Sequence, residues 1–165
     1  MNNPLQFVYR IVSMLILKYI IILSLFLSQT AFGAGSYDSN DTSNLDGDYK
    51  LGLELIKKEK YKSAISKFKK LINKKSDNYT QADIYNYLGY THRKLMKYDD
   101  AETYYLKALK LDSDHVGALE YIGELYLETD RIEEAKKSLQ KLKSVAGESS
   151  NEYLELSTLI KNYSQ

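Results

Sequence analysis

Residues 82–115 read ADIYNYLGYTHRKLMKYDDAETYYLKALKLDSDH, and residues 116–149 read VGALEYIGELYLETDRIEEAKKSLQKLKSVAGES. The pair Leu88-Gly89 of the first stretch recurs 34 residues later as Ile122-Gly123. Further small and large residues keep the same spacing, in the pairs Tyr98/Ile132, Ala101/Ala135, Tyr105/Leu139 and Ala108/Leu142. A fixed period of this length is typical of stacked helical repeats, so the two stretches predict two copies of one structural unit.

A third copy precedes these two. Leu51-Gly52, Ala64 and Phe68 match the middle copy at a spacing of 37 residues. The three additional residues fall near Tyr79-Thr80-Gln81, between two copies, where a chain tolerates insertions. We therefore expect three repeats, at residues 45–78, 82–115 and 116–149.

Each copy contains two amphipathic helical stripes. In the middle copy, Tyr85, Leu88, Gly89 and His92 stand at i, i+3, i+4 and i+7 and predict one helix, and a facing stripe that begins at Tyr98 predicts a second. Glycine and alanine let two helices approach closely, and a large residue of the facing helix fills the gap. The residues assigned to this repeat packing are Leu51, Gly52, Ala64, Phe68, Leu88, Gly89, Ala101, Tyr105, Ala108, Ile122, Gly123, Ala135 and Leu139.

This order of small and large residues resembles the tetratricopeptide repeat (TPR) family over residues 45–147. The resemblance implies an all-α fold, an α-solenoid of three helix-turn-helix repeats. Ser149 and Glu152 form a capping box that begins one more helix, expected at residues 150–165. We expect this helix to cover the apolar face of the last repeat and to expose a polar side to water.

The N-terminal segment has the layout of a secretory signal peptide, expected at residues 1–33. Arg10 and Lys18 precede the apolar stretch Tyr19–Leu27, and the small residues Ala31 and Gly33 place the cleavage site before Ala34. An uncleaved membrane anchor is the alternative. Either outcome places the rest of the chain outside the cytoplasm, in the periplasm or secreted, and the C-terminal tail resembles that of small exported bacterial TPR proteins. Residues 34–48, rich in Asp, Asn, Ser and Gly, predict a flexible linker.

The composition argues against an enzyme. The chain has no cysteine, which excludes thiol catalysis and Cys-ligated metals, and it has two histidines, His92 and His115. Neither a glycine-rich phosphate loop nor a zinc-protease or serine-hydrolase motif is present in the sequence. We expect no catalytic residues, no metal and no cofactor. The net charge of +1 gives no basis for nucleic-acid binding.

Charge is distributed unevenly along the chain. Ten lysines stand against two acids between Lys50 and Lys75, and eleven acids stand against three bases between Asp99 and Glu134. Solvated helix faces often carry such charges. The alternatives are an anionic partner at the first repeat, head-to-tail association of two copies into a homo-oligomer, or contact with an anionic membrane surface, above all if the N-terminal segment is retained.

The TPR resemblance also implies a binding surface, the concave face lined by the first helix of each repeat. The residues expected there are Tyr49, Leu53, Asn86, Tyr87, Tyr90, Arg93, Lys94, Tyr121 and Glu124, with Tyr90 and Arg93 as central anchors. The places where one TPR subtype clamps a C-terminal carboxylate hold Tyr49, Leu53, Tyr87, Gly117 and Tyr121, so such a clamp is not expected. The predicted function is an adaptor for a peptide or protein partner. The alternative is a structural or self-associating part of a membrane-anchored envelope assembly.

Overall fold

The computed structural model describes residues 42–163, with side chains from Leu45 onward. The signal peptide, its cleavage residues Ala31, Gly33 and Ala34, and the linker before Thr42 lie outside the described residues. The described part is helical and contains no strand. Its helices are α2 (Thr42–Lys57), α3 (Tyr61–Leu71), α4 (Gln81–Lys94), α5 (Tyr98–Leu111), α6 (Val116–Glu128), α7 (Ile132–Ala146) and α8 (Asn151–Tyr163).

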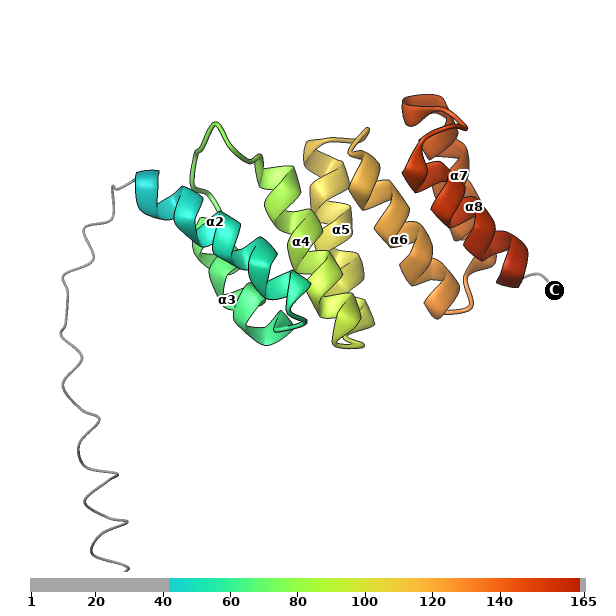
Figure 1. Ribbon diagram of the computed structural model, residues 1–165. Coiled ribbons are helices and arrows are strands. Elements are labelled where there is room, and N and C mark those ends of the chain that lie inside the picture. The colour runs from blue at the N-terminus through green and yellow to red at the C-terminus, as the bar shows by residue number, and fades with distance from the viewer. Residues whose placement is uncertain (1–41, 164–165) are drawn as a thin grey trace, which may run out of the picture. The chain divides into compact units, whose positions relative to one another are not determined.

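The helices form three successive hairpins followed by a last single helix (Figure 1). The helices α2 and α3 pack as one pair, α4 and α5 as the second, and α6 and α7 as the third. The second helix of each pair also contacts the next pair, and α8 packs on both α6 and α7. The predicted all-α solenoid of three repeats with a C-terminal helix is therefore confirmed. In residues 42–163 no helix is long and apolar enough to span a bilayer.

The turn inside each hairpin has the same geometry in all three repeats. Glu59, Met96 and Asp130 have positive φ angles of 55°, 58° and 60°. The next residue in each turn, for example Arg131, donates its backbone N–H five residues back, to Tyr126 at 2.7 Å. This bond belongs to the Schellman motif, which ends a helix on a left-handed residue. Glycine usually occupies that place because it has no Cβ. Glu59, Met96 and Asp130 therefore carry some backbone strain there.

Two glycines make the close helix approach that the repeat spacing predicts. A Cβ on Gly52 would lie 2.7 Å from the Phe68 ring of α3, and a Cβ on Gly89 would lie 2.5 Å from the Tyr105 ring of α5. Each glycine thus faces the aromatic residue of its own repeat's second helix. Both rings are fully buried and hold their hairpins together.

The third repeat closes differently. A Cβ on Gly123 would lie 2.5 Å from Leu156 of α8, and no atom of Leu139 lies among its nearest neighbours. The expectation that Gly123 faces the second helix of its own repeat is wrong. Leu139 is smaller than the tyrosine or phenylalanine at this place in the other repeats, and Leu156 of the C-terminal helix fills the space above the glycine.

Two further expectations need correction. Leu51 was assigned to repeat packing but is 39% exposed, whereas its counterpart Leu88 is fully buried. Leu88 contributes to the core that α3 shares with α4, and no helix among the described residues precedes α2 to cover Leu51 in the same way.

The second correction concerns the linker, because α2 already begins at Thr42. Residues 42–48 are helical since they find tertiary partners. Leu45 packs against the core that α3 shares with α4, and the carboxylate of Asp48 accepts a hydrogen bond from Lys67 Nζ at 2.6 Å. The first helix of the solenoid therefore starts three residues before the predicted repeat boundary at residue 45.

Candidate functional site

The first helices of the repeats, α2, α4 and α6, contact one another through tyrosine rings, and we call the face that they form with α8 the inner groove. Part of this face is a hollow of about 490 Å³ between α4, α6 and α8. The residues that line the hollow are Arg93, Lys94, Glu124, Leu127, Glu128, Leu159, Asn162 and Tyr163. Three of the expected groove residues, Arg93, Lys94 and Glu124, thus meet in one place, and α8 supplies a wall that the sequence analysis did not assign.

Tyrosines line the N-terminal part of the inner groove. Tyr49 stacks on Tyr79 with ring centroids 4.9 Å apart, and Tyr87 stacks on Phe68 at 5.3 Å. Tyr90 meets Tyr121 of the next repeat at 5.1 Å. These groove tyrosines are half-buried, and burial raises the pKa of the Tyr49 and Tyr121 hydroxyls. The rings therefore join neighbouring repeats and keep part of their surface open to the groove.

Arg93 does not have the open position expected of a central anchor. Only 3% of the residue is exposed. Its guanidinium binds Glu124 at 2.5 Å and Glu128 at 2.6 Å, both on α6, and lies 5.7 Å from the ring centre of Tyr90. Arg93 therefore joins the second and third repeats. Its Nε is buried without a hydrogen-bond acceptor.

The other expected groove residues on α4 differ in exposure. Asn86 is buried, its amide approaches Gly117 at the start of α6, and its Oδ1 has no hydrogen-bond donor. Lys94 is exposed, with Nζ 5.4 Å from the ring centre of Tyr90. On α2, the expected groove residue Leu53 is half-buried against the core that α3 shares with α4. Of the expected groove residues on α4, Tyr87, Tyr90 and Lys94 thus remain at least partly accessible.

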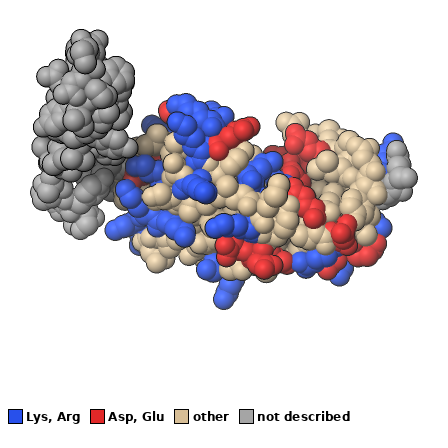
Figure 2. Space-filling view, turned by 90° about the horizontal axis from the view of Figure 1, so that it is seen from below, with Lys and Arg blue, Asp and Glu red and all other residues tan. Residues whose placement is uncertain are grey.

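Acidic residues dominate the C-terminal part of the inner groove. Glu120 on α6 is only 5% exposed, and burial, followed by the charges of Glu124 and Glu155, raises the pKa of its carboxyl to about 8. Glu155 lies on α8 and is exposed. Figure 2 shows the corresponding trend on one face, with Lys and Arg gathered towards the N-terminal helices and Asp and Glu towards the C-terminal ones.

The groove residues of α8 are not among those expected from the sequence. The sequence predicts a terminal helix with one buried apolar face, and Leu156 and Ile160 form that face. Both are buried, whereas Leu154 and Leu159 are exposed and lie off that face. Two leucines outside the buried face of a terminal helix are the signal that a sequence analysis could have used.

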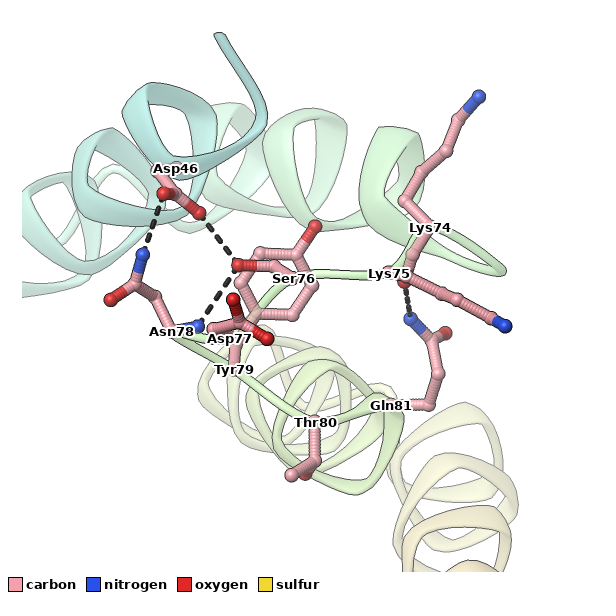
Figure 3. Close-up of a pocket in the computed structure, with 9 residues that line it drawn as sticks. All are labelled: Asp46, Lys74, Lys75, Ser76, Asp77, Asn78, Tyr79, Thr80 and Gln81. Carbon is pink, nitrogen blue, oxygen red and sulfur yellow. Dashed lines mark hydrogen bonds between the residues drawn. The ribbon is translucent and has the colours of Figure 1, made fainter. Parts of the chain in front are cut away.

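A second hollow, of about 580 Å³, lies beside the connection between α3 and α4, where the three additional residues occur (Figure 3). Several of its polar groups pair with one another. Asp46 of α2 accepts hydrogen bonds from Ser76 Oγ at 2.7 Å and Asn78 Nδ2 at 2.6 Å, and the Gln81 side chain donates to the Lys74 carbonyl at 2.6 Å (Figure 3). These bonds fix the connection between α3 and α4, and the Tyr79 hydroxyl is buried there without a hydrogen-bond partner.

Both histidines take part in contacts that support the fold. His92 is buried, and its Nδ1 lies 2.7 Å from the Leu88 carbonyl oxygen. His115 caps α6 through the Ala118 N–H, and its Nε2 lies 3.1 Å from Asp83 of α4. This contact lowers the pKa of Asp83 to about 2. Within residues 42–163, no three His, Asp or Glu residues are grouped so as to hold a metal ion.

Protein sequences similar to this chain cover only part of it. An uncharacterized protein, ycf37, of Guillardia theta is 33% identical over 90 residues, which are 53% of this chain and 51% of that protein. The human protein O-mannosyl-transferase TMTC2 is 32% identical over 89 residues, 54% of this chain and 11% of that protein. The matched segment therefore spans about half of the first relative and about a tenth of the second.

Solved structures share the fold at lower identity. The first TPR of Spaghetti (RPAP3), bound to the HSP90 peptide SRMEEVD, superposes with a TM-score of 0.62 and 21% identity over 76% of this chain and 97% of that one. PcrH of Pseudomonas aeruginosa, solved with the chaperone binding region of PopD, has a TM-score of 0.65 and 17% identity over 78% and 96%. At these identities the likeness shows the fold alone.

The family is visible in the repeats themselves. Tetratricopeptide repeat models match residues 82–115 and residues 118–148, which are the hairpins α4–α5 and α6–α7. The first hairpin, α2–α3, has the same glycine-to-aromatic contact and the same turn. Sequence, fold and family models agree, and the chain belongs to the tetratricopeptide repeat family.

Proposed function

We propose that this protein is a non-catalytic adaptor that holds a segment of another protein in its inner groove, outside the cytoplasm. The hollow between α4, α6 and α8 is the observation that carries the proposal. Two large side chains at its rim, Leu159 and Tyr163, are 42% and 44% exposed. Apolar surface of this kind beside a hollow is typical of interaction sites, because a partner gains free energy by covering it.

The tyrosines extend this surface towards the first repeat. Tyr90 and Tyr121 are half-buried, and their rings lie 5.1 Å apart. Tyrosine offers a large contact area with a polar tip and has few side-chain torsions to restrict on binding. The related folds of Spaghetti and PcrH hold peptides, an HSP90 peptide and a PopD region respectively, which supports the same role here.

The occupant of the groove is an internal segment of a partner. The places where a carboxylate clamp would stand hold Tyr49, Leu53, Tyr87, Gly117 and Tyr121. None of these side chains carries a cation that would attract a C-terminal carboxylate. A partner would instead be recognised through its own side chains.

Photo-crosslinking tests this proposal with a matched control. A benzoylphenylalanine at position 159 should capture a partner in intact cells, and the same group at position 106 should not. Leu106, on α5, is a leucine of similar exposure, 50% against 42%, outside the groove. Crosslinks from position 106 but not from position 159 would place the partner on the outer surface and overturn the proposal.

The location outside the cytoplasm rests on the N-terminal sequence. Arg10 and Lys18 precede the apolar stretch Tyr19–Leu27, and Ala31 and Gly33 follow it at signal-peptidase spacing. Sequencing the N-terminus of the mature protein should therefore give Ala34. Intact chain recovered from membranes by detergent alone would favour the anchor, and intact chain in the cytoplasm would contradict export.

Self-association is the second candidate function. Leu154 and Leu159 on the last helix are 51% and 42% exposed, so α8 leaves apolar surface for another copy. Light scattering after size exclusion decides between the two functions. A monomer at high protein concentration would contradict self-association and leave the adaptor.

A further inference from the structure

The inner groove changes character along the solenoid, although equivalent repeat positions line it. One position holds Tyr49, Asn86 and Glu120 in successive repeats. A second position, four residues later in each helix, holds Leu53, Tyr90 and Glu124. A segment that lies along this groove therefore meets aromatic and apolar side chains first and carboxylates afterwards.

In the C-terminal part of the inner groove, formed by α6 and α8, the carboxylates outnumber the cations that pair with them. Arg93 pairs with Glu124 and Glu128, and Lys94 lines the same hollow, so the charges of that hollow balance and the excess lies on α8. Glu152 and Glu155 of α8 form no ion pair with a lysine or arginine in the described part of the chain. The raised pKa of the Glu120 carboxyl has burial as its first cause and the neighbouring carboxylates next, which is consistent with this excess.

Apolar side chains stand directly beside these acids. A hollow of about 390 Å³ on α8 is lined by Leu154, Glu155, Thr158 and Leu159. Leu159 also lines the larger hollow between α4, α6 and α8. Leu159 is therefore common to both hollows, and the exposed Glu155 lies in the same hollow as Leu154 and Leu159.

We infer that the inner groove selects a protein segment in which a lysine or arginine stands close to a leucine-sized apolar residue. The apolar residue occupies the hollow at Leu159, and the cation lies against Glu155. This inference rests on the proposed function and specifies its ligand. Opposite charge gives the selection because the carboxylates repel acidic segments and lack an internal counterion.

A random dodecapeptide library displayed on phage tests the inference without knowledge of the natural partner. Selections are made on the full wild-type chain, on Glu155→Gln and on Glu133→Gln. Glu133 is an exposed glutamate on α7, paired with Lys136, and serves as the matched control. The wild type and Glu133→Gln should enrich lysine or arginine within a few residues of leucine, isoleucine or phenylalanine. The Glu155→Gln chain should lose this basic preference.

Fluorescence anisotropy with the most enriched peptide then gives the size of the effect. Glu155→Gln should weaken binding about two- to fivefold, as expected for one exposed ion pair. The difference from wild type should vanish at about 0.5 M salt, where exposed charges are screened. Enrichment of acidic peptides, absence of any charge preference, or equal effects of Glu155→Gln and Glu133→Gln would overturn the inference.

A failure of the proposed function has a different signature. If enriched peptides bind Leu159→Asp as tightly as wild type, they do not use the groove, and the adaptor site itself is wrong. If no peptide is enriched on any chain, the groove does not bind extended segments, and both proposals fail. Peptides that require Leu159 but show no preference for basic residues would leave the adaptor site standing and overturn the inference alone.

Discussion

The first and last hairpins of the solenoid share one fold but close it with different residues. In α2–α3 the ring of Phe68 lies over Gly52, so the hairpin is closed from within. In α6–α7 the space over Gly123 is taken by Leu156 of the following helix. The first hairpin thus contains its own closing residue, and the third depends on α8. A repeat protein can therefore keep its backbone constant while it moves the closing contact from inside a repeat to its neighbour.

The same contrast holds for the surfaces. The N-terminal part of the inner groove contains Tyr49 and Tyr87, and the C-terminal part contains Glu120 and Glu124. Arg93 lies at the border and binds the glutamates of the following repeat. Four sets of substitutions test this difference between the halves, from the largest expected effect on stability to the smallest.

Arg93→Ala should have the largest effect, a loss of about 3 kcal/mol in the free energy of unfolding, because it leaves Glu124 and Glu128 together without their cation. Lys94→Ala, at the exposed neighbouring position, should change stability by less than about 0.5 kcal/mol. Urea denaturation followed by circular dichroism measures both values. Equal, small losses would mean that Arg93 does not join the second and third repeats.

Glu120 should make the free energy of unfolding depend on pH. Its carboxyl has a pKa of about 8 in the folded protein against an ordinary value of 4.5, so the native state holds an extra proton between these two values. The free energy of unfolding contributed by this group therefore falls as pH rises through that window and levels off above it. Glu120→Gln should abolish the fall and be more stable than wild type at about pH 9, by on the order of 3 kcal/mol.

Denaturation at a series of pH values, with Glu133→Gln on exposed α7 as the control, measures this effect. Glu120→Gln and wild type should converge near pH 4, where the carboxyl is protonated in both states. A variant less stable than wild type at high pH would mean that the Glu120 carboxylate has a favourable partner.

Gly89 and Gly123 face different side chains, so replacing each by alanine should destabilise the fold by different amounts. Gly89→Ala presses a methyl group against the rigid, buried ring of Tyr105 and should cost about 2 kcal/mol. Gly123→Ala meets the methyl ends of Leu156, which move more easily, and alanine also favours the helix, so its cost should stay below about 1 kcal/mol. Thermal melting compares the two variants. A larger loss at Gly123 would mean that α8 is held as rigidly as the internal rings.

The exposed leucines should affect binding and leave stability almost unchanged. Leu159→Ser and Leu106→Ser should each alter the free energy of unfolding by less than about 0.5 kcal/mol, because both side chains already face water. Capture of a groove-selected peptide should fall only with Leu159→Ser. Loss of capture with Leu106→Ser would move the binding surface to α5.

The repeat signal predicted the helix pairs well and the side-chain partners less well. Gly52 and Gly89 face the aromatic residues that the sequence spacing pairs with them, because both members lie within one hairpin and the local helical period places them. Gly123 breaks that rule, because α8 competes for the same space. Leu51 was misassigned since its exposure depends on what precedes the first repeat and not on its own helix.

The candidate site was predicted only in outline. Tyr90, Lys94 and Glu124 lie on the expected face, but Arg93 was taken for an open anchor and is buried between two glutamates. Its partners stand 31 and 35 residues further along the chain, so their distance depends on how one repeat is rotated against the next. No local pattern contains that rotation.

The sequence by itself therefore determined the number of repeats, the helix pairs and the glycines at which two helices approach closely. These features depend on a period that is repeated along one chain. Only the tertiary structure decided which charges pair, where α8 meets the groove and that Glu120 is buried. Those features arise where side chains from different repeats converge, and their energies depend on distance and burial rather than on sequence order.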